Sequence, residues 1–258
     1  MDFSQFLNEQ TDDWIFNSLG IESFNLTSRS RLRHWFTHVR NNHLILKGDI
    51  LEFGVYKGGG VIAMGLLLKS LGSNKKIYAF DSFSGFPGYH KNDDLSVFEK
   101  RPDIFEKDLV KKAALCKEIA EWRVGEEITP ENISTSGNFS DATKQSLEQK
   151  IKKFGLDNVE VIEGDFKDTV PSFFNNFKGS VFSANIDCDL YAGYKESLAP
   201  TYNRCVIGSM IYLDEYYSLK FPGARVAVHE FLDQSSANLT LLSSDENDFE
   251  RWAIIKEK

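Results

Sequence analysis

The chain has 258 residues, of which 41% are hydrophobic and 26% are charged, and this composition fits one large globular α/β domain. Its net charge of −8 and the lack of a basic stripe in the sequence argue against nucleic acid as a partner, and its longest notable apolar run, 61–68, is too short to span a bilayer. The first residues carry no signal peptide and the three cysteines are scattered, so we expect a cytoplasmic protein with reduced thiols and no membrane partner.

Residues 1–46 are predicted to form a helical extension ahead of a main domain at 47–258. We expect short helices there, the second beginning near 27–30, and we expect the segment to pack beside the main domain or to form an oligomer contact. Arg29, Arg31 and Arg33 stand at alternate positions in this segment. They could contact an anionic substrate, but a solvated helix face is the favoured interpretation.

From Gly48 onward the pattern alternates between strands and helices. This alternation predicts an α/β fold in which a mostly parallel sheet is joined by right-handed crossovers, and a closing pair of strands predicts an antiparallel edge. The predicted strands are 49–53, 76–80, 158–162, 181–186, 206–213, 239–243 and 251–256, and the predicted helices are 58–71, 140–154, 169–177, 194–202 and 223–231.

The segment 86–127 interrupts this alternation. It follows the turn sequence Gly-Phe-Pro-Gly at 85–88 and contains a charged, amphipathic stretch at 103–122. An insertion of this kind is often a lid or a substrate-binding segment. His90 would reach a site beneath such a lid, whereas His229 is expected to be packed within its helix.

A glycine-rich loop, residues 52–60, follows the first predicted strand. It lacks the second glycine of the dinucleotide-binding pattern, and its last glycine is followed by valine rather than by the Lys-Ser/Thr of a phosphate-binding loop. What remains is an acid before a looser glycine pattern, which is similar to motif I of S-adenosylmethionine-dependent methyltransferases. A purely structural glycine turn is the alternative. The candidate cofactor-binding residues here are Glu52, Gly54, Tyr56 and Gly58.

Acids also stand at the ends of the next two predicted strands. Asp81, beside Ser82, is placed to accept the ribose hydroxyls of a nucleoside cofactor. Asp165 is placed to meet an adenine ring, on which Phe166 would stack. The order of these acids after the glycine loop favours an adenosyl cofactor.

Two further apolar runs end abruptly in acids. Asp187 and Asp189 follow the run 181–186, and Asp214 and Glu215 follow the run 206–213. Because the carboxyl ends of parallel strands meet at one edge of a sheet, these four carboxylates are expected to converge there. Without a cation or a strong pKa shift they could not all stay ionised, and carboxylate oxygens suit magnesium, calcium or manganese.

Residues beside these acids have other expected roles. Cys188 is expected to point to the opposite face from its neighbours rather than to ligate a metal, since side chains alternate along a strand. Tyr191 and Tyr216 closely follow the acids and are candidates for the wall of an acceptor pocket.

With these motifs in order, residues 50–258 resemble the macrocin O-methyltransferase family, which methylates sugar hydroxyls on antibiotics. The resemblance implies a class I, Rossmann-like methyltransferase fold with helices on both faces of the sheet, S-adenosylmethionine as donor, a magnesium ion, a small-molecule or glycan acceptor and a homo-oligomer. The matching segments are 52–58, 81–87, 164–169, 186–191, 214–216 and 221–225.

Carried over residue by residue, the resemblance places Asp187, Asp214 and Glu215 at the metal-ligand positions and Asp189 at the position of the general base. The family usually has Asp-Gly-Asp where this chain has cysteine in the middle, and two aspartates where this chain has Asp214 and Glu215. The second departure leaves the coordination by Glu215, and with it the metal preference, open.

Three alternatives remain at this stage. Within the same class, a catechol-like phenol also offers adjacent oxygens to a metal. A nicotinamide-dependent oxidoreductase on a similar sheet is disfavoured by the missing glycine pattern. A non-enzymatic calcium- or carbohydrate-binding module would explain the acids alone.

Overall fold

The strands form one mixed sheet in the computed structural model, which describes residues 11–244 and 248–257. The sheet has seven strands in the order β3-β2-β1-β4-β5-β7-β6. Strands β3 to β5 are parallel, and β7 is antiparallel to both β5 and β6. The predicted parallel sheet with an antiparallel edge is therefore confirmed. The bounds are β1 Asp49–Phe53, β2 Ile77–Asp81, β3 Val159–Glu163, β4 Val181–Ile186, β5 Cys205–Leu213, β6 Asn238–Ser243 and β7 Arg251–Ile255.

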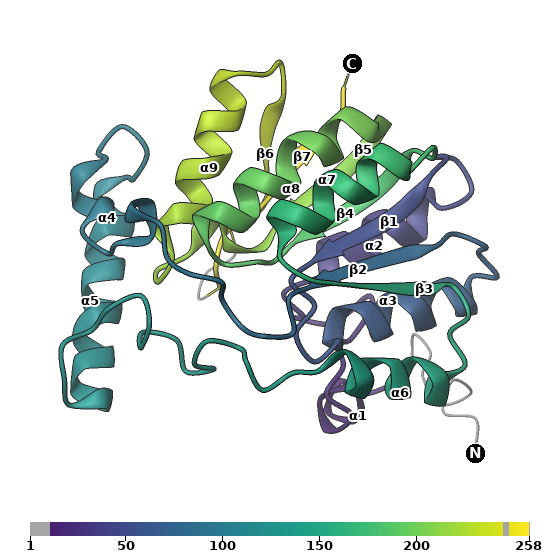
Figure 1. Cartoon of the computed structure of the whole chain (residues 1–258), viewed down its shortest axis with the longest axis horizontal. Helices are drawn as coiled ribbons and strands as arrows, with labels where there is room; N and C mark the ends of the chain where they lie inside the picture. Colours follow the sequence, from purple (N-terminus) through teal and green to yellow (C-terminus); the bar gives the residue numbers. More distant parts are fainter. Residues whose placement is uncertain (1–10, 245–247, 258) are drawn as a thin grey trace.

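Helices cover both faces of the sheet (Figure 1). The apolar helix α3 packs with α2 and α6 on one face, and α7, α8 and α9 cover the other. None of the helices in the described ranges is long and apolar enough to cross a bilayer. The bounds are α1 Asp13–Ser18, α2 Arg33–Asn42, α3 Gly59–Ser70, α6 Lys144–Phe154, α7 Phe166–Asn176, α8 Tyr191–Arg204 and α9 Pro222–Asp233.

The strand order creates a crevice between β1 and β4. The chain runs outward from β1 to β3 on one side and from β4 to β5 on the other, so the connections leave the two central strands in opposite directions. Ligands of open α/β sheets bind at such a switch point, beyond the carboxyl ends of the strands. At this point Gly54 has a φ of 85°, and a Cβ there would collide with the backbone oxygen of Asp187. Glycine therefore allows the two central strand ends to approach each other.

The N-terminal segment shares the core of the sheet. Trp35 and Phe36 of α2 are buried in the same cluster as α3, and the indole of Trp35 donates a hydrogen bond of 2.9 Å to the hydroxyl of Ser183 in β4. The second helix begins at Arg33 rather than near 27–30. The hydroxyls of Ser28 and Ser30 accept backbone N–H groups two residues ahead, which favours turns over helix. The first ten residues of the expected extension lie outside the described ranges.

The predicted starts of α6, α7 and α8 are three or four residues from the observed ones, and for α6 and α7 the capping residue explains the difference. Helix α6 begins after Thr143, whose hydroxyl accepts from Ser146 N, and not at Ser140. Helix α7 begins at Phe166, three residues before the predicted start, because the carboxylate of Asp165 caps it by accepting from Lys167 N.

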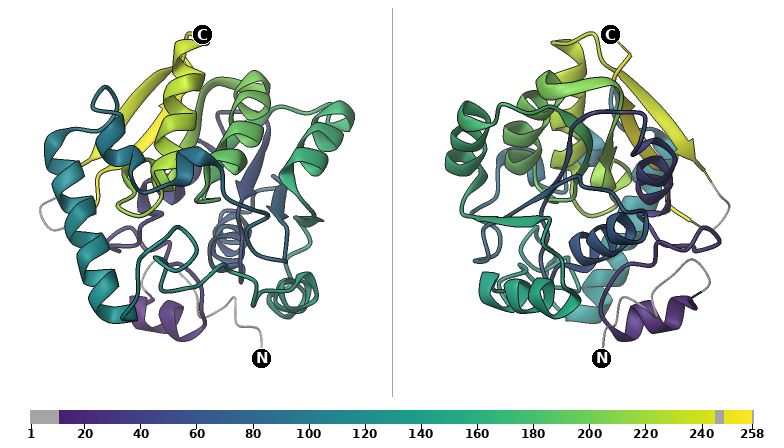
Figure 2. Two further views of the ribbon diagram at one scale, coloured as in Figure 1. Left: turned by 60° about the vertical axis from the view of Figure 1, so that its left-hand side comes forward. Right: turned by 90° about the vertical axis from the view of Figure 1, so that its right-hand side faces the viewer.

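The insertion folds into a 3₁₀ turn, η2 (Lys91–Asp93), and two helices, α4 (Val97–Lys100) and α5 (Lys107–Val124), beside α9 (Figure 2). Asp93 fixes it to the main domain. This fully buried carboxylate accepts hydrogen bonds of 2.8 Å from the backbone N–H groups of His90 and of Tyr191 at the start of α8. The start of the insertion is thereby held against the carboxyl end of β4.

A buried histidine on α2 makes stability depend on pH. Burial against Phe182 lowers the pKa of His38 from 6.5 to about 4. The unfolded chain therefore binds a proton that the folded chain does not, so stability is lost as the pH falls from 6.5 to 4. We expect His38→Phe to remove up to about 3 kcal/mol of that pH dependence. Urea unfolding at several pH values measures it, and parallel curves for both proteins between these pH values would contradict the assignment.

Candidate functional site

A cavity of about 860 Å³ opens at the carboxyl ends of the parallel strands. It brings together all but one of the predicted site residues. Gly58 is the exception: a Cβ there would collide with Leu147 of α6, so this glycine serves packing. The predicted residues that line the cavity are Glu52, Gly54, Tyr56, Asp81, Ser82, Asp165, Phe166, Asp187, Asp189, Asp214 and Glu215.

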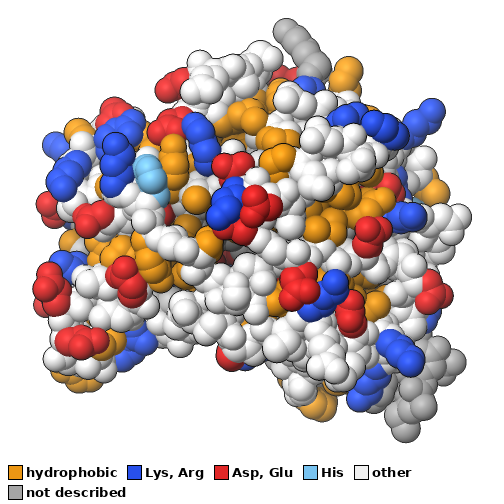
Figure 3. All heavy atoms as spheres, viewed as in Figure 1, with side chains coloured by type: hydrophobic (Ala, Val, Ile, Leu, Met, Phe, Trp, Pro, Cys, Tyr) orange, Lys and Arg blue, Asp and Glu red, His pale blue; other side chains and the backbone are white. Residues whose placement is uncertain are grey.

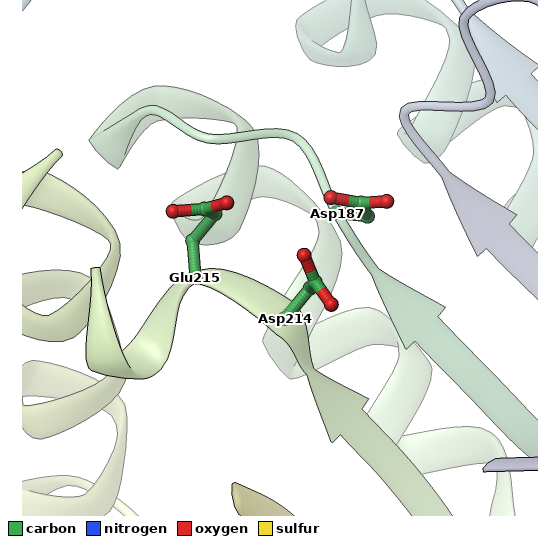
Figure 4. Close-up of side chains that lie close together, drawn as sticks. All are labelled: Asp187, Asp214 and Glu215. Atoms are coloured by element: carbon green, nitrogen blue, oxygen red, sulfur yellow. The ribbon is translucent and has the colours of Figure 1, made fainter. Parts of the chain in front are cut away.

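Three of the acids form a compact group. Asp187 follows β4, while Asp214 and Glu215 open the 3₁₀ turn η3 (Asp214–Tyr217) directly after β5, and their side chains turn toward one another (Figure 4). One carboxylate oxygen from each lies within 4.8 Å of the others. The arrangement follows from register, because β4 and β5 are paired in parallel up to Ile186 and Leu213.

The three carboxylates of this group are buried close together, which favours either protonation or a nearby positive charge. Burial raises the pKa of Asp187 well above its ordinary value, and burial together with Asp214 raises the pKa of Glu215 to about 7. The Oδ1 atom of Asp214 is buried and has no hydrogen-bond partner. An unpartnered buried oxygen within a set of hard oxygen donors fits a divalent cation such as Mg²⁺.

Arg31 places a positive charge in contact with two of these acids. Its Nη1 lies 2.8 Å from Oδ2 of Asp187 and 2.6 Å from Oδ2 of Asp214, and its Nε lies 3.3 Å from Oε1 of Glu22. The interpretation of Arg31 as part of a solvated helix face is therefore wrong. Residue 31 precedes α2 and is held by the serine turns, which direct its side chain into the cavity.

Asp189 stands apart from the three-acid group on the same cavity wall. Its φ of 58° is unusual for an aspartate, and burial with the nearby Glu215 raises its pKa well above the ordinary value. A carboxylate with a raised pKa is a better proton acceptor near neutral pH. Cys188, between the acids, directs its sulfur toward Gly193 of α8, where a Cβ would lie 2.6 Å from it. The cysteine lines the same cavity as Asp187 and Asp189 but is not part of the three-acid group.

On the other side of the cavity, Asp81 organises two loops. Its carboxylate accepts hydrogen bonds of 2.8 Å from the backbone N–H groups of Tyr56 and Phe83, which have φ values of 47° and 51°. These strained conformations hold the glycine loop and the 82–85 turn around the cavity. Remaining lone pairs of Asp81 are free to accept hydroxyl groups.

Glu52 lies beneath the first turn of α3. The amide of Asn185 donates to its carboxyl at 3.1 Å, and Gly60 leaves the room that this carboxyl fills. Burial raises the pKa of Glu52 to about 8, so the group is mostly neutral at pH 7. At the far wall, the ring of Phe166 packs edge-on against Phe53 with centroids 5.8 Å apart.

The histidine and tyrosine candidates differ in whether they line the cavity. His90 lines the cavity and stacks on Tyr191 with ring centroids 4.4 Å apart. His229 is packed against Tyr216, to which it is hydrogen-bonded at 2.9 Å. Neither tyrosine is among the residues that line the cavity, so their predicted place in the pocket wall is wrong: the hydroxyl of Tyr191 instead binds Glu230.

Four residues with a part in the site were missed in the sequence or, for Arg31, assigned mainly to another role. Arg31 and Glu22 belong to the N-terminal segment, Asn185 lies within β4, and Asp93 lies in the insertion. Asn185 gave the one available signal, because it lies inside the apolar run 181–186 and a buried amide needs a partner. The other three act through contacts between segments that are distant in sequence.

Positive and negative side chains are mixed on one face of the molecule. On the face shown in Figure 3, basic side chains are interspersed with acidic ones rather than gathered in a block. Nucleic-acid-binding domains instead concentrate lysine and arginine on one face.

Comparison with known proteins supports the same fold. The chain is 20% identical to the O-methyltransferase NovP, with a TM-score of 0.60 over 88% of this chain and 78% of that one. The calicheamicin methyltransferase CalS11 gives a TM-score of 0.58 at 23% identity, over 87% and 77% of the two chains. An O-methyltransferase from Bacillus cereus in complex with SAH gives 0.50 at 13% identity, over 94% and 88%.

Two relatives match in sequence. The chain is 26% identical to mycinamicin III 3''-O-methyltransferase of Micromonospora griseorubida, over 77% of this chain and 65% of that protein. It is 24% identical to 8-demethyl-8-(2,3-dimethoxy-alpha-L-rhamnosyl)-tetracenomycin-C 4'-O-methyltransferase of Streptomyces olivaceus, over 71% and 58%. The chain thus spans less than two thirds of the length of these relatives.

The family model for macrocin O-methyltransferases matches residues 4–107 and 130–247, which is most of the chain. The class I fold and the sheet order agree with that match. The chain belongs to the macrocin O-methyltransferase family.

Proposed function

We propose that this protein transfers a methyl group from S-adenosylmethionine to a sugar hydroxyl of a natural product or glycan, with the help of Mg²⁺. One observation carries the proposal. The carboxyl ends of β4 and β5 bring three carboxylates within 4.8 Å of one another, in the same cavity as the glycine loop and Asp81.

The cofactor half is assigned to the loops after β1 to β3. Asp81 would accept the ribose hydroxyls, and Asp165 with Phe166 would meet the adenine. Glu52, Tyr56 and Ser82 would surround the rest of the cofactor, while Gly54 leaves the crevice open. S-adenosylmethionine supplies the methyl group when it is bound. This choice of donor is supported by the match of the chain to the macrocin O-methyltransferase family and by the SAH bound to the similar structure from Bacillus cereus.

The acceptor half is assigned to the acids. Asp187, Asp214 and Glu215 would hold the cation, which would polarise and orient the acceptor hydroxyl. Asp189 would take the proton of that hydroxyl as the displacement proceeds. The start of the insertion at 86–90 lines the cavity, so we assign the insertion to acceptor contacts and to the exclusion of water.

A sugar is the proposed acceptor because the name of one sequence relative includes a rhamnosyl group in its substrate, and the other relative is named for the methylation of mycinamicin III. A catechol-like phenol is the alternative that the acids alone would also serve. Turnover assays with S-adenosylmethionine and panels of glycosides and catechols, each with Mg²⁺, distinguish the two acceptor classes.

Cofactor binding is tested without an acceptor. S-adenosylhomocysteine is expected to raise the Tm of the native protein, since a ligand of the folded state stabilises it. Asp81→Asn is expected to weaken that binding about 10- to 100-fold, because a charged acceptor is lost. Calorimetric titration measures the affinity, and Glu160→Gln on the exposed surface of β3 is the control. Stabilisation by NAD and not by S-adenosylhomocysteine would overturn the proposal in favour of an oxidoreductase.

A further inference from the structure

Arg31 lies where a cation bound by the acids would lie. Its Nη1 contacts Oδ2 of Asp187 and Oδ2 of Asp214 at the same time, at 2.8 and 2.6 Å. In the ion-free protein this contact balances carboxylates that are otherwise buried together, and an unbalanced buried charge is strongly destabilising. Arg31 therefore has a structural role at the site before any ion binds.

The guanidinium and a divalent cation exclude each other at these oxygens. An ion bound at Oδ2 of either aspartate would need lone pairs that now accept from Arg31. An ion at the unpartnered Oδ1 of Asp214 would still lie close to the guanidinium, and two positive charges in one small site repel. Ion binding therefore favours movement of the Nη1 end of Arg31.

Glu22 offers a second position for the guanidinium. Its Oε1 lies 3.3 Å from Nε of Arg31, and its other oxygen accepts from the hydroxyl of Ser30 at 2.7 Å. The backbone of Glu22 is fixed independently by a hydrogen bond to Gly59 O. The side chain of Arg31 is 35% exposed, so it has space to move.

We propose that Arg31 is an internal counter-ion that holds the ion-free site together and competes with the divalent cation. When the cation binds, Arg31 stays on Glu22 and directs Nη1 into the cavity toward the acceptor. This inference rests on the ion site of the proposed function.

Binding of Mg²⁺ to three proteins tests the competition, with calorimetry in the presence of S-adenosylhomocysteine. Arg31→Met is expected to bind Mg²⁺ at least about tenfold more tightly than the wild type, because no counter-ion must be displaced. In chelator its Tm is expected to fall, and Mg²⁺ is expected to restore it. Arg29→Met removes the same charge from an exposed position and is expected to match the wild type.

Equal or weaker Mg²⁺ binding by Arg31→Met would overturn the competition while leaving the ion site intact. If neither the wild type nor either variant binds Mg²⁺, the ion site of the proposed function fails as well. Arg31→Lys keeps a positive charge with fewer donors, so it replaces the methionine variant if that variant does not fold. Tighter Mg²⁺ binding by Arg31→Lys than by the wild type supports the proposal, and equal or weaker binding overturns it.

Discussion

Asp189→Asn is expected to lower kcat by about a thousandfold, within the range that general-base catalysis supplies. The side chain keeps its size and its place on the cavity wall but can no longer take a proton. Asp189 belongs neither to the three-acid group nor to the glycine loop, so affinities for S-adenosylhomocysteine and Mg²⁺ are expected to remain close to those of the wild type.

Turnover assays at saturating substrate, together with the two binding titrations, separate these effects. Asp168→Asn makes the same chemical change at an exposed position of α7 and is expected to retain full turnover. Unchanged kcat in Asp189→Asn would exclude it as the base and would direct attention to His90, which lines the same cavity.

Asp214→Asn is also expected to lower turnover strongly, but through loss of the ion rather than loss of the base. Asp214 is shared by Arg31 and the proposed ion, and its Oδ1 is the buried oxygen without a partner. Removing its charge is expected to abolish measurable Mg²⁺ binding and to lower turnover at least about a hundredfold, since a Lewis acid is worth several kcal/mol to the transition state.

The readouts are calorimetry with Mg²⁺ and turnover at high Mg²⁺ concentration. S-adenosylhomocysteine binding is expected to persist, which separates loss of the ion from loss of the fold. Asp157→Asn, at the opposite end of the sheet, is the control. Mg²⁺-dependent turnover in Asp214→Asn equal to that of the wild type would remove this residue from the ion site.

The features that were predictable from the sequence are those set by neighbouring residues. Strands β1 and β4 have the predicted bounds, because β1 ends at Phe53 before the glycine loop and β4 is an apolar run that ends in an acid. Parallel pairing then placed Asp187 beside Asp214 without further information. The cavity and most of its lining follow from strand order alone.

The features that were not predictable depend on contacts between distant segments. Arg31 reaches the acids because two serine turns redirect the chain before α2, and nothing in the alternation of arginines shows this. Asp165 was assigned to a ligand, but its carboxylate also caps α7, and this dual use moved the start of the helix. Tyr191 turned away from the cavity because Glu230 of α9 offers its hydroxyl a partner.

The strand-end acids are proposed to hold one ion beside the methyl donor. Addition of Mn²⁺ to protein bound to S-adenosylmethionine labelled with ¹³C in its methyl group tests whether they do. We predict strong broadening of the methyl resonance that saturates at one ion per chain and disappears in Asp214→Asn. A methyl signal that Mn²⁺ leaves sharp, or broadening that survives in Asp214→Asn, would contradict the claim.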